Sequence, residues 1–115
     1  MASSVPPTAP PGLPPRILRQ AAAMMRAISH PARLRIIELL LKQPLPVGEL
    51  ALAMRMPPHL VSGHLKELRV VNAVSFKRDG RQKLYRVASP EAAMIFRCIQ
   101  RNYFTNLTFQ DGEAI

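Results

Sequence analysis

The stretch PPHLVSGHLKEL, residues 57–68, combines side chains that could bind a ligand with a spacing that predicts a helix. Val61, Leu65 and Leu68 recur at helical intervals and would form one apolar stripe. The opposite side would carry small polar groups, a glycine and cations, namely His59, Ser62, Gly63, Lys66 and Arg69. Hydroxyl and imidazole groups can bond to base edges, whereas ammonium and guanidinium groups suit phosphates or guanine. This segment is therefore a candidate for reading DNA, and an ordinary solvated helix face is the plain alternative.

Gly63 and His64 each allow two interpretations. A glycine inside a helix costs about 1 kcal/mol of stability relative to alanine, so Gly63 should allow a favourable interaction that offsets this cost. That interaction could be close approach to DNA or close packing on a neighbouring helix. His64 lies beside the apolar stripe and could be a half-buried structural histidine or a phosphate contact.

The other elements follow from periodicity and from helix breakers. Helices are predicted over residues 16–29, 30–42, 46–54, 57–71 and 89–104. Ser29 is expected to cap the second helix, and Asn72 to take the left-handed conformation after the fourth. His30 is expected at a helix start rather than in a ligand set.

Residues 73–87 predict a β-hairpin around Asp79-Gly80. Its inward side chains are expected to be Val74, Phe76, Leu84 and Val87, and its outward ones Lys77, Arg78, Arg81 and Lys83. A short helix pair followed by a basic hairpin is typical of a winged helix-turn-helix. The predicted fold is mainly α with a β-hairpin (α+β), in the order α-α-α-α-β-β-α.

Length and charge limit the possible partners. The chain has 115 residues and a net charge of +9, which fit one domain and favour a polyanionic partner, either nucleic acid or an anionic membrane. Between residues 66 and 86 there are seven basic residues and two acidic ones.

Residues 1–15 hold six of the twelve prolines and are expected to form a disordered tail. The folded domain is then expected over 16–106, with a C-terminal tail over 107–115.

The single cysteine and the absence of a long apolar run bear on location and cofactors. Cys98 alone cannot make an intramolecular disulfide, which fits a reducing, cytoplasmic compartment, and no membrane span or secretory signal is expected. One cysteine and three histidines do not make a converging metal site, so no metal or other cofactor is expected. Cys98 is expected to be a small buried apolar residue, with a redox switch across a dimer as the minor alternative.

Four segments closely resemble the small winged-helix repressors of the ArsR (ArsR/SmtB) type: ISHPARLRIIELL, PVGELALAM, LVSGHLKELRVVNAV and KRDGRQKLYRV. The resemblance covers roughly residues 19–100. It implies a homodimer built on the first and last helices, with two recognition helices entering successive major grooves of operator DNA. The family's V-S-x-H-L motif reaches DNA through its serine and the residues just before it, which carries over to Ser62, His59 and Leu60.

The first and last predicted helices are apolar on more than one side, as a helix packed on both a core and a partner chain would be. The residues that we expect at this dimer interface are Ile17, Ala21, Met24, Ile95, Ile99 and Tyr103.

The sequence departs from the family pattern in several places. Pro57 and His59 stand where the family often has serine, and Pro46 where it often has a capping serine. Asn72 replaces the usual glycine after the recognition helix. The third helix lacks the cysteine pair of the metalloid-sensing members, and the last helix lacks the histidine and carboxylate sets of the zinc-sensing members.

These observations favour a sequence-specific, homodimeric DNA-binding repressor without a metal effector, whose inducing signal is unknown. A repressor that responds to a thiol reaction or to a small ligand is one alternative. A winged-helix module for protein interaction is another, although such a surface usually includes apolar anchors. An enzyme is not expected, because there is no nucleophile–base pair, phosphate-binding glycine loop or pair of carboxylates at working distance.

Overall fold

The computed structural model describes residues 12–107, with side chains through Tyr103. It contains five helices and one antiparallel hairpin, in the order that the sequence predicts. The elements are α1 (Pro15–Ile28), α2 (Pro31–Lys42), α3 (Val47–Met54), α4 (Pro58–Val70), β1 (Val74–Asp79), β2 (Gln82–Val87) and α5 (Pro90–Leu107). The predicted winged helix-turn-helix is thus confirmed.

The two predicted tails fall mostly outside the described residues. Of residues 1–15, the structure describes 12–15, and Pro15 already belongs to α1. Of residues 107–115 it describes Leu107, which closes α5. α5 is therefore longer than the predicted 89–104.

The hydrophobic core lies where α2, α3 and α4 meet the hairpin. Its largest fully buried side chains are Ile36, Ile37, Leu50, Val61, Leu65 and Leu68. All three residues of the predicted apolar stripe on α4 are in this set, so the periodicity of that helix is confirmed. Because one side of α4 is fully buried, its other side is presented to solvent.

The hairpin corrects one prediction. Phe76 pairs with Tyr85 and Val74 with Val87, so these four side chains share the inner face, and Tyr85 is buried. Leu84 pairs with Lys77 on the other face, which contradicts its predicted inward position. Leu84 and Val87 are three residues apart and cannot point to the same face of a regular strand. The register follows from a two-residue loop whose first residue, Gly80, has φ +64°.

A second correction concerns the start of α2. Ser29 does not cap this helix, because its hydroxyl donates to the carbonyl of Arg26 instead. His30 is the cap residue, and its Nδ1 accepts a hydrogen bond from the Ala32 amide at 3.1 Å. The predicted place of His30 at a helix start is confirmed.

The end of α4 and the start of α5 have caps that are common at helix termini. Asn72 has φ +60°, the left-handed conformation predicted for the residue after the fourth helix. Ser89 precedes α5, and its hydroxyl accepts from the Ala92 amide and donates to Glu91. This hydrogen bond lowers the pKa of the Glu91 carboxyl below its usual value.

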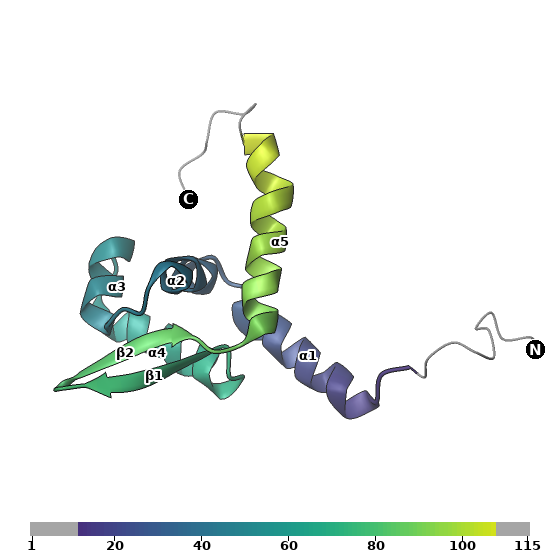
Figure 1. Ribbon diagram of the computed structural model, residues 1–115, viewed down its shortest axis with the longest axis horizontal. Helices are drawn as coiled ribbons and strands as arrows, with labels where there is room; N and C mark the ends of the chain where they lie inside the picture. Colours follow the sequence, from purple (N-terminus) through teal and green to yellow (C-terminus); the bar gives the residue numbers. More distant parts are fainter. Residues whose placement is uncertain (1–11, 108–115) are drawn as a thin grey trace, which may run out of the picture.

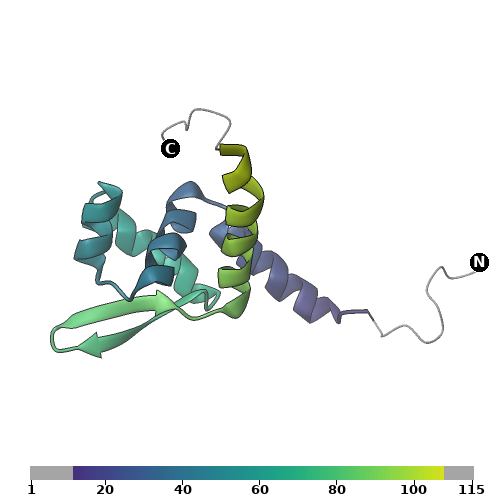
Figure 2. The ribbon, with the colours of Figure 1, turned by 45° about the horizontal axis from the view of Figure 1, so that its top comes forward.

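Figures 1 and 2 show how the elements are arranged. The hairpin extends from one end of the molecule, whereas the first turns of α1 project from the other end, beyond α5. α2 lies between α3 and α5, where it packs against both. Among residues 12–107, no helix is long and apolar enough to cross a membrane.

Candidate nucleic-acid interface

A short turn joins α3 to α4 and sets the helix pair. The Arg55 backbone has φ +52° and caps α3 with a hydrogen bond from its amide to the Leu52 carbonyl at 3.3 Å. Pro57 and Pro58 then open α4 at once. A left-handed arginine is an unusual way to end a helix, since glycine or asparagine takes this conformation more easily. The sequence offered no signal for Arg55.

The outer face of α4 is the centre of the candidate interface. Leu65 and the rest of the stripe are buried, and the opposite side is exposed to solvent. The exposed side chains are His59, Leu60, Ser62, Lys66 and Arg69, with Gly63 among them. Helical periodicity assigns all of these except Leu60 to this face, and the exposure of those five residues agrees with that prediction. Whether they touch DNA stays a prediction.

The surroundings of Gly63 decide between the two explanations for it. A methyl group placed on its Cα would meet no atom within 4 Å in the described part of the chain. Packing against a neighbouring helix of this chain is therefore wrong as an explanation. Close approach of an external partner stays a prediction, and a solvated position on the helix face is the plain alternative to it.

His64 differs from its neighbours because it is half-buried. Its Nδ1 accepts a hydrogen bond from Nε of Arg33 at 3.2 Å, and its ring lies 4.6 Å from the ring of His30. Arg33 also donates to the carbonyl of Ala27 at 3.1 Å. Burial lowers the pKa of the His64 imidazole, and the nearby His30 and Arg33 lower it further. The contacts of His64 therefore support its interpretation as a structural residue. They link α4 to α2 and, through Arg33, to the end of α1.

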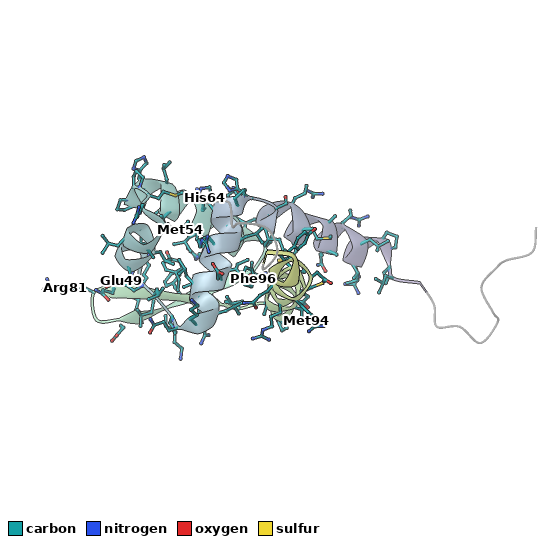
Figure 3. The ribbon with its side chains drawn as sticks, turned by 90° about the horizontal axis from the view of Figure 1, so that it is seen from above. Glu49, Met54, His64, Arg81, Met94 and Phe96 are labelled. Carbon is teal, nitrogen blue, oxygen red and sulfur yellow. The ribbon has the colours of Figure 1, made fainter. Side chains whose placement is uncertain are left out.

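The hairpin carries the second group of cations. Lys77, Arg78 and Arg81 are exposed, as predicted, whereas Lys83 is half-buried with Nζ 4.7 Å from the centre of the Phe76 ring. Figure 3 shows Arg81 at the tip of the hairpin, at the end of the molecule away from α5.

Very little negative charge opposes these cations. Among the described side chains, Arg35 and Glu38 form the one salt bridge, and both belong to α2. None of the seven basic residues between 66 and 86 is paired with a carboxylate. Arg86 is held by the hydroxyl of Ser75 at 3.3 Å. The positive charge of helix and hairpin is therefore available to an external anion.

The predicted dimer residues lie on α1 and α5, two helices that expose apolar side chains among their polar ones. Met24 and Ile95 are half-buried and pack partly on the core, and Ile17 and Ile99 are also half-buried. Ala21 and Tyr103 are exposed. Further exposed apolar residues on the same helices are Leu18, Met25 and Met94. In Figure 3, Met94 points away from the body of the molecule, whereas Phe96 lies on the side of α5 that faces α2.

Cys98 contradicts its prediction. It is exposed in the chain rather than buried, because it lies on the outer side of α5. The side-chain amide of Asn102 donates to its carbonyl at 2.7 Å and approaches its Sγ at 3.3 Å. Among the described residues, no three His, Cys, Asp or Glu side chains are grouped so that they could hold a metal ion.

The profile described as "Bacterial regulatory protein, arsR family" matches residues 30–75, which include α2, α3 and α4. The HTH-type transcriptional repressor SmtB of Mycobacterium tuberculosis is 39% identical over 89 residues, which cover 77% of this chain and 66% of that repressor. The chain thus spans slightly less than two thirds of this relative's length.

Two solved structures are similar throughout the domain. The crystal structure of NolR from Sinorhizobium fredii is 30% identical, with a TM-score of 0.72 over 81% of this chain and 96% of that one. The solution structure of a homodimeric winged helix-turn-helix DNA-binding domain from Mycobacterium bovis, a possible ArsR-family regulator, is 26% identical. Its TM-score is 0.74 over 90% of this chain and 98% of that one.

Proposed function

The chain belongs to the arsR family of bacterial regulatory proteins, and from this premise we propose that it is a homodimeric repressor that binds operator DNA. α4 is the recognition helix in this proposal, and the β1–β2 hairpin is the wing. Since the target is chromosomal DNA, the protein would act in the cytoplasm.

One observation carries the proposal: the two sides of α4 differ completely. Val61, Leu65 and Leu68 are at most 1% exposed, so α4 cannot rotate without breaking the core. Its other side is open, and Ser62 and Gly63 add little bulk there. A helix with this profile can enter a major groove, where side chains reach base edges.

Each element has a role in the proposed complex. Ser62 and His59 would bond to base edges, and Leu60 would contact apolar groups at the start of the helix. Lys66 and Arg69 would meet phosphates or guanine, and the wing would add sequence-independent phosphate contacts. The wing residues in this role are Lys77, Arg78, Arg81 and Lys83. His64 would contribute mainly by positioning α4, through Arg33.

Dimerisation through α1 and α5 is part of the proposal. The apolar residues exposed on these helices support it, as does the homodimeric state of the similar mycobacterial domain. Two copies of α4 related by a twofold axis would read a palindromic site with half-sites about one helical turn apart. We further propose that the effector is not a metal ion bound within one chain, because the chain offers only one cysteine and three histidines as soft or imidazole ligands.

Fluorescence anisotropy tests the proposal. The chain is titrated into its own upstream DNA and into a scrambled duplex, at two salt concentrations. We expect a preference of about a hundredfold or more for the upstream DNA, retained at the higher salt. Equal and steeply salt-dependent binding to both duplexes would mean that the interaction is nonspecific and electrostatic, without base readout. Absence of binding at low salt would overturn the proposal and favour a protein-interaction module.

A further inference from the structure

The aromatic ring of Phe76 contacts a cation from each part of the candidate interface. The guanidinium carbon of Arg69, in the last turn of α4, lies 4.5 Å from the ring centre. Nζ of Lys83, on β2, lies 4.7 Å from the same centre. Both distances are within the range in which the ring quadrupole attracts a cation. Phe76 therefore connects the recognition helix to the wing through two charged side chains.

The ring itself is held in place by the sheet. Phe76 pairs with Tyr85 across the hairpin, and the two ring centres are 5.4 Å apart at an interplanar angle of 48°. Tyr85 is buried, and its backbone bonds to Leu45 in both directions. Lys83 is two residues before Tyr85 on the same face, which brings its long side chain diagonally across to Phe76. The cations thus rest on a fixed support.

An aromatic ring orients a cation without neutralising it. A carboxylate in the same place would cancel the positive charge and would occupy the N–H donors. Neither Arg69 nor Lys83 has a carboxylate partner among the described side chains. Both therefore keep their charge and their donors for an external anion. Both charges lie within 4.7 Å of one ring centre, so a phosphate bound beside the ring could meet donors from both side chains.

We propose that Phe76 is a positioning residue that holds Arg69 and Lys83 as a two-cation clamp for DNA phosphate. This inference rests on the proposed DNA-binding function. Long cationic side chains lose rotamer freedom when they bind, and a side chain already held in place loses less. The clamp would also fix the wing relative to α4, so that phosphate and base contacts form in register.

The contacts can first be tested in the free protein by NMR. A cation over a ring places its neighbouring methylene protons in the ring current. We expect the Hε protons of Lys83 and the Hδ protons of Arg69 to be shifted upfield. Both shifts should disappear in Phe76→Leu, which keeps apolar bulk but has no ring, and should persist in Phe76→Tyr. Ordinary shifts in the wild-type chain would overturn the clamp.

DNA binding then tests the role by a double-mutant cycle. In the wild-type background, Phe76→Leu should weaken binding about three- to tenfold on both the upstream and the scrambled duplex, and Phe76→Tyr should bind like the wild type. In a chain that already carries Arg69→Gln and Lys83→Gln, Phe76→Leu should weaken DNA binding by less than about twofold. Val87→Ala is the matched control, because Val87 shares the face of Phe76 but has no aromatic ring to offer a cation. It should lower thermal stability and leave affinity unchanged.

The outcomes separate this proposal from the proposed function. If Phe76→Leu costs the same with and without the two cations, the ring acts only through packing and the clamp is wrong. The clamp is also wrong if Phe76→Tyr weakens DNA binding as much as Phe76→Leu does. If the wild-type chain binds neither duplex, the proposed function fails and the phosphate role fails with it. The NMR shifts then show that the failure does not come from missing contacts.

Discussion

Arg33 and His64, which are 31 residues apart, are joined by a hydrogen bond from Nε of the arginine to Nδ1 of the histidine at 3.2 Å. Because Nδ1 accepts, the neutral His64 carries its proton on Nε2. Arg33 is anchored in turn to the carbonyl of Ala27, at the end of α1. One arginine thus ties the proposed recognition helix to the junction of α1 and α2.

Burial of the His64 imidazole, with His30 and Arg33 nearby, makes stability depend on pH. The folded pKa of His64 lies below its ordinary value of 6.5, so the unfolded chain takes up the proton more readily. The stabilising contribution of His64 is therefore present above about pH 6.5 and is lost as the pH falls through that value toward the lower folded pKa. We expect chemical denaturation to give a wild-type free energy of unfolding that falls between pH 7.5 and 5. In His64→Gln, whose amide oxygen can still accept from Arg33, the fall should be smaller. Identical pH profiles would contradict the shift.

Gly63→Ala should change stability and DNA affinity in opposite directions. The added methyl group meets no atom within 4 Å, so the free energy of unfolding should rise by up to about 1 kcal/mol from helix propensity. The same methyl group should hold the helix away from the groove and weaken specific binding about tenfold. Gly48→Ala is the matched control, because Gly48 is also helical and exposed with open space around it, but lies in α3. Full affinity of Gly63→Ala would show that close approach does not require glycine.

Ser62→Ala tests base readout. Loss of the hydroxyl should reduce the preference for the upstream duplex over the scrambled one about five- to tenfold, and His59→Ala should also erode it. Ser29→Ala is the control, because this exposed hydroxyl bonds only to the Arg26 carbonyl at the end of α1. The measurement is anisotropy on both duplexes at one salt concentration. An equal loss on both duplexes would assign Ser62 to the phosphate backbone instead.

Lys77→Gln and Arg78→Gln should act differently from the serine change. Each would remove one phosphate contact of the wing, so binding to all sequences should weaken alike. The slope of log affinity against log salt should become smaller by about 1 for each substitution. Lys42→Gln, at the exposed end of α2, removes the same charge outside α4 and the wing and should leave the slope nearly unchanged. If all three substitutions lower the slope equally, net charge matters and the wing does not.

Ile99→Asp should dissociate the proposed dimer. A carboxylate on this half-buried position of α5 would be desolvated in an interface between two chains. We expect the dimer dissociation constant to rise at least about thirtyfold, the equivalent of roughly 2 kcal/mol. Sedimentation velocity over a dilution series measures this constant. Gln100→Asp adds the same charge at the neighbouring exposed position and should leave the dimer intact; an equal effect would place the interface elsewhere.

Local rules were sufficient for most of the fold and for the shape of the candidate interface. The stripe of Val61, Leu65 and Leu68 identified both sides of α4, because helical periodicity depends only on residues close in sequence. Asn72 and Gly80 marked the end of α4 and the hairpin turn, because their backbones take positive φ at low cost. The amino-acid composition likewise predicted the basic character of the helix and the wing.

The sequence by itself thus determined the elements, their order, and which helix face is left open. The tertiary structure decided the rest: Tyr85 rather than Leu84 faces the core, Cys98 is exposed, and Gly63 has no neighbour within the described chain. It also decided the partners of His64 and Phe76. Each of these depends on strand register or on side chains from separate elements, and those distances exist only once the core has packed.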